Sequence, residues 1–194
     1  MSEKYEIILA AEESFSRKVA LGVIVSRPLT VWHYLIPGMF IFNFLRRTSE
    51  VKRYSEHFLF PRRVAIHLAQ VVIRGGKKEE SLSRAEDEIR AWLTSLNVYS
   101  EALRKAKMEM TKFLTEHYSR LLKVDGNSHE ELIKNAYKDK GSYEAHLSQL
   151  TSLEDEVDSA IVETLGENEQ LRERLLVEKT QVDKLRRQTV EEIF

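Results

Sequence analysis

Apolar and polar positions follow helical spacing along most of the chain. From Tyr5 to Val25, apolar residues recur every three to four positions with charged residues between them, which predicts an amphipathic helix. The stretch from Pro28 to Leu45 reads PLTVWHYLIPGMFIFNFL and is apolar over eighteen residues. After Ser83 the apolar residues follow a heptad period. The sequence therefore predicts an all-α protein, with a proline-broken hydrophobic helical hairpin followed by long heptad-patterned helices that form a bundle or coiled coil.

The apolar stretch contains a turn at its centre. Pro37 and Gly38 suit the two central positions of a type II turn, and proline has no N–H to continue a helix. As one helix the stretch would extend about 27 Å, slightly less than a hydrocarbon core of ~30 Å. Arginines flank both sides, which suits a re-entrant hairpin with both ends on the cytoplasmic side. The residues expected to insert into a membrane are Leu29, Trp32, Leu35, Ile36, Pro37, Gly38, Phe40, Phe42 and Phe44.

Basic residues are concentrated around and after this stretch. Residues 14–78 contain twelve Lys and Arg against two acids, although the whole chain has a net charge of −1. A helix that begins at Pro61 has one narrow polar stripe (Arg63, His67, Gln70 and Arg74), so it must be buried in protein or lie in a bilayer interface. Each cation near an anionic leaflet contributes about 1 kcal/mol. The expected contacts with anionic lipid are Arg46, Arg47, Lys52, Arg53, Arg62, Arg63, Arg74, Lys77 and Lys78.

A first long helix is predicted from Ser83 to Val124. Ser83 and Glu86 have the spacing of a capping box, and the apolar a and d positions of a heptad follow them. Additional apolar residues at e positions widen this face and favour a bundle over a two-stranded coiled coil. The residues expected to contact a partner or a second copy of the chain are Ile89, Trp92, Leu96, Leu103 and Phe113.

A short helix and a second long helix complete the predicted arm. Ser128 and Glu131 form another capping box, and Gly141 is expected to end the short helix that they begin. A second, weaker heptad pattern runs from Tyr143 to Glu192, with Asn168 at an a position where a polar residue can fix register. Its expected partner contacts are Leu171, Leu175 and Leu185.

Charges beside the two heptad patterns suggest association between chains. Acidic g positions in the first long helix (Glu88, Glu109 and Glu116) match basic e positions in the last one (Arg172, Lys179 and Arg186), as in parallel helices. The connection between the two helices is too short to let them run parallel within one chain. The sequence thus predicts a membrane-associating part, residues 1–80, and a helical arm, residues 81–194, that binds itself or a protein partner.

Motifs for catalysis or cofactor binding are not found in the sequence. Without cysteine, disulfides and thiolate zinc sites are excluded. The six histidines fit no Glu-x-x-His or His-x-x-x-His pattern, and the glycines form no phosphate-binding loop. A single Arg-Gly-Gly gives little support for nucleic-acid binding. We therefore expect no catalytic, cofactor or metal site and no evident small-molecule substrate. The charged start of the chain, Met1 to Lys4, lacks the features of a secretory signal.

The preferred interpretation is a non-enzymatic adaptor or scaffold, associated with the cytoplasmic face of a membrane, that presents a coiled-coil arm. One alternative is a soluble all-α subunit of a multiprotein complex, in which the apolar N-terminal part is core or subunit interface. A more remote alternative is an enzyme acting on a lipid-linked substrate through His33 or His67. That enzyme would require one of these histidines to line a cavity with another titratable group.

Overall fold

The computed structural model describes the backbone of residues 3–25 and 39–194, and the side chains of residues 3–24 and 48–194. These residues form helices joined by short turns, without a β-strand, so the predicted all-α class is confirmed. The helices are α1 (Glu3–Val25), α2 (Met39–Ile73), α3 (Lys78–Ser95), α4 (Glu101–Lys123), α5 (His129–Tyr137), α6 (Lys140–Leu165) and α7 (Glu169–Ile193).

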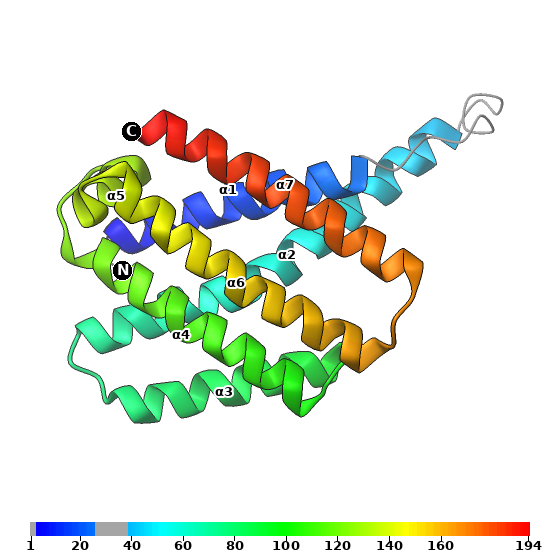
Figure 1. Ribbon diagram of the computed structural model, residues 1–194, viewed down its shortest axis with the longest axis horizontal. Coiled ribbons are helices and arrows are strands. Elements are labelled where there is room, and N and C mark those ends of the chain that lie inside the picture. Colours follow the sequence, from blue (N-terminus) through cyan, green and yellow to red (C-terminus); the bar gives the residue numbers. More distant parts are fainter. Residues whose placement is uncertain (1–2, 26–38) are drawn as a thin grey trace.

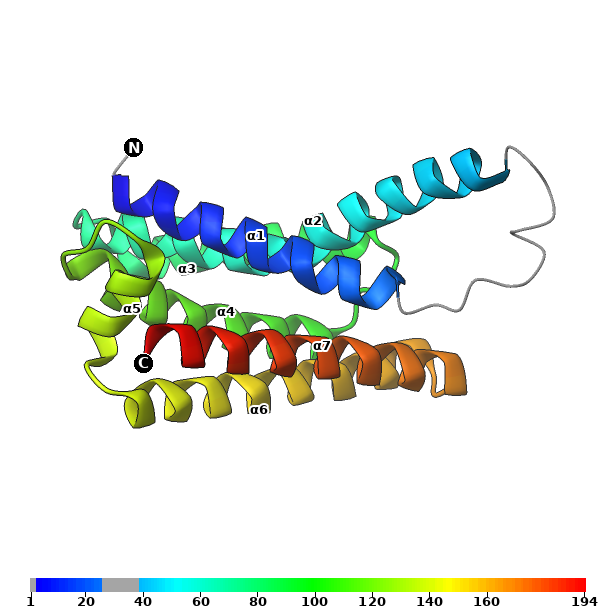
Figure 2. The ribbon, with the colours of Figure 1, turned by 90° about the horizontal axis from the view of Figure 1, so that it is seen from above.

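The helices pack as a bundle in two layers. Figure 2 shows α1, α2 and α3 on one side and α4, α6 and α7 on the other, with the short α5 at one end. The fully buried side chains include Ile8, Ile66, Ile89, Leu114 and Ile133, which come from five different helices. Removal of so much apolar surface from water is the main stabilising contribution to such a bundle. The helices of residues 1–80 and those of residues 81–194 therefore share one core.

Helix α2 is longer than the sequence predicted. It begins at Met39 and passes through Pro61, where the predicted helix was expected to start. Its second half is buried in protein, since Val64 and Leu68 are less than 9 % exposed and Ala65, Ile66 and Ala69 are fully buried. Of the two environments predicted for this apolar helix, the structure shows packing against protein.

The predicted long helix from Ser83 to Val124 is wrong, because the chain turns between α3 and α4. Helix α3 begins after Lys77, so Ser83 lies inside it and does not cap it. Asn97 adopts a positive φ of 57°, which asparagine tolerates better than most residues. The Ser100 hydroxyl then accepts a hydrogen bond from the Leu103 N–H at 3.1 Å and begins α4.

The second predicted long helix is also two helices, α6 and α7, which lie side by side (Figure 1). Gly166 ends α6 with a φ of 79°, a conformation that glycine adopts without steric cost. The Asn168 side chain accepts a hydrogen bond from the Leu171 N–H at 2.8 Å. Asn168 is thus the N-cap of α7, and the predicted role in coiled-coil register is replaced by this local one.

The capping box at Ser128 is present, with one difference in geometry. The Ser128 hydroxyl accepts from the Glu131 N–H at 3.2 Å, while the Glu131 carboxylate accepts from the Asn127 N–H at 2.8 Å. Helix α5 ends at Tyr137, four residues before the Gly141 end that was predicted. Asp139 caps the next helix, α6, by accepting from the Ser142 N–H at 2.8 Å.

The cations that suggested pairing between chains have partners within the chain. Lys179 pairs with Asp155, Arg186 with Glu154 and Arg172 with Glu167. These carboxylates belong to α6 or to the turn that precedes α7. The charge pattern is therefore explained by the contact between α6 and α7, and it no longer indicates a second subunit.

Candidate functional site

Helices α1 and α2 form an antiparallel hairpin. The contacts Glu12–Arg62 and Phe15–Phe58 progress in opposite directions along the two helices. At this register Val25 lies level with about residue 48 of α2. The nine helical residues before that point, residues 39–47, therefore extend roughly 14 Å past the end of α1. Figures 1 and 2 show these first turns of α2 projecting beyond the rest of the bundle. Both ends joined by residues 26–38 therefore lie at the same end of the molecule.

Three of the nine predicted membrane-inserting residues fall in the projecting first turns of α2. Leu29, Trp32, Leu35, Ile36, Pro37 and Gly38 lie outside the described residues. Phe40, Phe42 and Phe44 belong to the first turns of α2, as do Arg46 and Arg47, but their side chains lie outside the described part. Among the described helices, none has an apolar stretch of the length and hydropathy needed to cross a bilayer.

Exposed cations predicted to contact anionic lipid lie both in the first half of α2 and in the segment that follows its end. Lys52 and Arg53 are exposed and come seven and eight residues after Leu45, so they lie about 10 Å along the helix from it. Arg74 comes twenty-nine residues after Leu45, about 44 Å away, and Lys77 and Lys78 lie further along the chain. Electrostatic attraction to a surface falls off over a Debye length of about 8–10 Å. Of the cations whose side chains are described, only Lys52 and Arg53 lie within reach of a membrane that holds the hairpin end.

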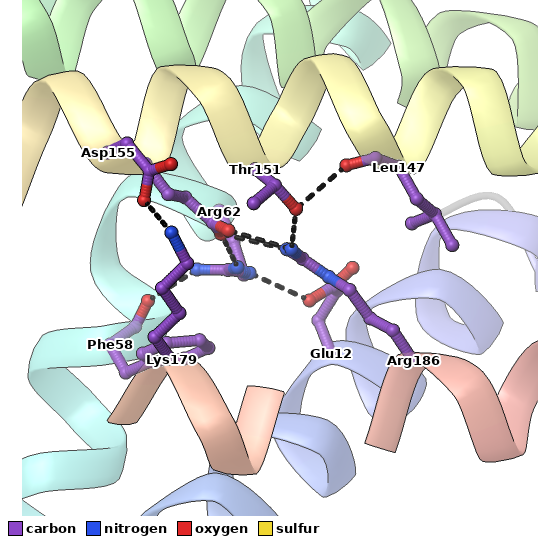
Figure 3. A network of polar contacts seen from close by, with 9 residues as sticks. Glu12, Phe58, Arg62, Leu147, Thr151, Asp155, Lys179 and Arg186 are labelled. Carbon is purple, nitrogen blue, oxygen red and sulfur yellow. Dashed lines mark hydrogen bonds and ion pairs between the residues drawn. The ribbon is translucent and has the colours of Figure 1, made fainter. Parts of the chain in front are cut away.

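Arg62 is buried, which corrects its assignment to the lipid-contacting residues. Its side chain is 5 % exposed, and its guanidinium forms ion pairs with Glu12 at 3.2 Å and with Glu154 at 3.1 Å (Figure 3). The same guanidinium donates to the Phe58 carbonyl at 3.2 Å and lies 4.0 Å from the centroid of the Phe58 ring. Arg62 therefore connects α1, α2 and α6 inside the protein.

Glu154 binds a second arginine and completes this network. Arg186 of α7 donates to the two carboxylate oxygens of Glu154 at 2.7 and 2.8 Å, and to the Thr151 hydroxyl at 3.2 Å. Burial of Glu154 opposes its ionisation, but the two arginines keep the pKa of its carboxyl below the ordinary value. Four helices meet at this network, and every charge in it has an opposite neighbour, which is the arrangement of a structural contact.

Two histidines, His117 and His146, form a second cluster with the rings of Phe113, Tyr118, Tyr137 and Tyr143. The His117 Nδ1 lies 2.7 Å from the Tyr137 hydroxyl, and the His117 and His146 rings stack with centroids 4.6 Å apart. Burial lowers the pKa of His117, and it lowers the pKa of His146 to about 4. Both rings are therefore neutral near pH 7. The described ranges contain no group of three His, Cys, Asp or Glu placed to hold a metal ion.

The predicted partner-contact residues pack within the chain. Ile89 and Leu103 are in the main core, and Trp92 and Phe113 pack against it. The Trp92 ring stacks on that of Phe60 at 4.8 Å between centroids. Leu185 packs against a smaller core around Val182, and Leu171 is half-buried. The heptad pattern thus identified faces of the helices that pack within the chain.

The remaining predicted contacts, Leu96 and Leu175, line a cavity that the sequence did not predict. The cavity has a volume of about 370 Å³ and lies among α2, α3, α4, α6 and α7. Its walls are mainly apolar, but the side chains of Tyr54, Lys107, Asp158 and Glu178 also line it. His67 is exposed and does not line this cavity, and His33 lies outside the described residues.

Comparison of the chain with protein-family models, with curated proteins and with solved structures finds no match. The functional argument therefore rests on the geometry of this molecule, in which two features stand out. One is the projecting end of the α1–α2 hairpin, and the other is the charged and apolar cavity.

Proposed function

We propose that the protein is a non-enzymatic helical adaptor that attaches to the cytoplasmic face of a membrane through residues 28–45 and presents its bundle to a protein partner. The observation that supports this function best is the antiparallel packing of α1 and α2. Val25, which precedes the apolar stretch, and the first turns of α2 lie at the same end of the bundle, as a segment that enters and leaves a bilayer on the same side requires.

Two further features support this orientation. The apolar stretch is next to exposed cations at Lys52 and Arg53, which would lie near anionic headgroups when residues 39–45 are inserted. The bundle core, by contrast, is filled from α1 and from the second half of α2 onward. Attachment through the projecting end would therefore leave the packed bundle intact on the aqueous side.

A vesicle flotation experiment on the full chain tests the proposal. We expect the protein to float with phosphatidylcholine vesicles that contain phosphatidylserine, and the variant with Phe40→Asp, Ile41→Asp and Phe42→Asp to remain at the bottom of the gradient. Charged residues at the centre of a bilayer cost about 2.5 kcal/mol or more each. The variant should retain the helical circular dichroism and the urea unfolding midpoint of the wild type, because these positions precede the packed part of α2.

Charge variants at the two ends of α2 provide a matched comparison. Lys52→Ser with Arg53→Ser should weaken binding to phosphatidylserine vesicles by roughly 2 kcal/mol in all, whereas Arg74→Ser with Lys77→Ser and Lys78→Ser should leave it unchanged. Failure of the wild type to float, or equal losses for the two sets, would contradict attachment through the hairpin end.

The second candidate function is a subunit of a multiprotein complex that buries residues 28–45 in protein. The burial of the neighbouring apolar half of α2 in this bundle favours it, because the same chain already uses such a surface as core. This function predicts an oligomer, or aggregation that detergent prevents, in analytical ultracentrifugation without lipid. The triple aspartate variant would then sediment as a monomer.

A further inference from the structure

The cavity between the two layers has the composition of a small-molecule site. Its volume of about 370 Å³ is within the range of roughly 300–1,000 Å³ that is typical of ligand pockets, and most of its wall is apolar. The apolar lining includes Phe58, Trp92, Leu96, Leu103, Val157 and Leu175. Among the polar residues that line it, Tyr54, Lys107, Asp158 and Glu178 come from α2, α4, α6 and α7, and Lys179, a second lysine, pairs with Asp155.

Lys107 is the amine in this group. Its Nζ lies 5.8 Å from the centroid of the Trp92 ring, and among the described residues it has no hydrogen bond or ion pair. Burial lowers the pKa of this amine, against the opposite influence of Glu178 and Asp158, while Arg62 lowers it further. A lysine with these surroundings has a larger neutral, nucleophilic fraction than an exposed lysine.

Asp158 provides a carboxyl that lines the same cavity as this amine. Its side chain is partly buried and, within the described part of the chain, forms no hydrogen bond or ion pair. Burial and the neighbouring Glu178 raise the pKa of Asp158 to about 7, so the carboxyl holds a proton for much of the time at neutral pH. The Glu178 carboxylate accepts a hydrogen bond from the Tyr54 hydroxyl.

We propose that this cavity binds an apolar aldehyde or ketone and that Lys107 forms a Schiff base with it. The neutral amine attacks the carbonyl carbon, forming a C–N bond, and one amine proton moves to the carbonyl oxygen. Asp158 then gives its proton to the resulting hydroxyl, the C–O bond breaks, and water leaves. The products are a protonated imine on Lys107 and the Asp158 carboxylate, which balances its charge. This activity is independent of membrane attachment.

The charges in the cavity favour a neutral ligand head group. A carboxylate would lie beside Glu178 and Asp155, and an ammonium would lie beside Lys107 and Arg62. A carbonyl oxygen carries no charge and can accept hydrogen bonds from both Lys107 and protonated Asp158. The hydrocarbon body would be removed from water against Trp92 and its apolar neighbours, which contributes about 25 cal/mol per Å² of buried apolar surface.

Reductive trapping on the full-length protein tests the proposal. The protein is incubated with decanal and cyanoborohydride, which reduces an imine to a stable secondary amine, and peptide mass spectrometry locates the alkyl group. We expect Lys107 to be labelled at least about tenfold faster than Lys105, which is exposed on the same helix. The saturated alcohol decanol should compete for the cavity and slow the labelling of Lys107 alone.

Two matched pairs of variants distinguish the site from the surface. Lys107→Arg should lose the fast label while Lys105→Arg keeps it. Asp158→Asn should slow the labelling of Lys107 by at least about tenfold, while Glu156→Gln, on the exposed face of α6, leaves the rate unchanged. Equal labelling of surface lysines and Lys107 in the wild type would overturn the proposal. That measurement requires no variant to fold, and it is unaffected by whether the protein floats with vesicles.

Discussion

The guanidinium of Arg62 and the carboxylate of Glu154 lie 3.1 Å apart inside the bundle, although 92 residues separate them in the sequence. Glu154 also binds Arg186, and Arg62 also binds Glu12, so one chain of contacts joins four helices. Each charge is largely removed from water, and each therefore depends on its neighbours. The network determines how the α1–α2 hairpin sits on the rest of the bundle.

Removal of the central carboxylate should destabilise the protein strongly. Glu154→Gln leaves Arg62 and Arg186 buried with reduced compensation, and we expect a loss of about 3 kcal/mol in the free energy of unfolding. Urea denaturation followed by circular dichroism measures it. Glu156→Gln on the same helix should change the stability by less than about 0.5 kcal/mol. Similar values for the two variants would show that the arginines do not depend on Glu154.

The stacked histidines predict a loss of stability in mild acid. The folded-state pKa of His146, about 4, is below its ordinary value of 6.5. The contribution of His146 to the free energy of unfolding is therefore complete above about pH 6.5, and it is lost as the pH falls towards 4. His146→Phe preserves a ring for stacking on Phe113 and should reduce this loss by about 2 kcal/mol between about pH 7 and pH 4.5. Unfolding in urea at the two pH values measures the difference.

The exposed His67 provides the control for this experiment. His67→Gln should keep the pH dependence of the wild type, because its ring is outside the buried cluster. An equally steep loss of stability in His146→Phe would assign the acid sensitivity to other groups.

Asp158 should have the opposite effect on the pH dependence of stability. The folded-state pKa of Asp158, about 7, is above the ordinary value of 3.8. The contribution of this carboxyl to the free energy of unfolding is therefore complete below about pH 3.8, and it is lost as the pH rises through 7. Asp158→Asn cannot ionise and should be more stable than the wild type by about 2 kcal/mol near pH 8, after allowance for solvent screening. The gain should disappear near about pH 4. A pH-independent difference between the two proteins would contradict this explanation.

Asn168 distinguishes a helix cap from a coiled-coil position. Asn168→Ala removes the acceptor for the Leu171 N–H and should cost about 1 kcal/mol of stability, without a change in sedimentation. Gln170→Ala, two residues further along and exposed, should have an effect below about 0.5 kcal/mol. A change in the oligomeric mass of the Asn168 variant would instead support its predicted role in register.

Local features of the fold could be predicted from the sequence. The helix over residues 3–25 and the cap at Ser128 depend on residues within one or two turns of each other, so periodicity and spacing are sufficient to identify them. The turns at Ser100 and Asn168 were missed because both residues are also compatible with a helix interior. The heptad pattern continues across each turn, because the helices on both sides bury the same kind of face.

The buried polar groups could not be predicted in the same way. Arg62 has the sequence context of an interfacial cation, beside Pro61 and Arg63, and its partners are 50 and 92 positions away. The cavity combines side chains from five helices, and none of its residues belongs to a short motif. Only the packing of the helices brings Lys107 and Asp158 together.

The order in which the chain is synthesised gives the Arg62 network a consequence for biosynthesis. Glu12 precedes Arg62, but Glu154 and Arg186 follow it and leave the ribosome much later. A nascent chain that ends before residue 154 has one of the two carboxylates that pair with Arg62, so the hairpin cannot bury this arginine without cost. We expect the first two helices to remain loosely associated during translation. The apolar stretch of residues 28–45 would then be available to a membrane or a chaperone before the later helices pack against the first two.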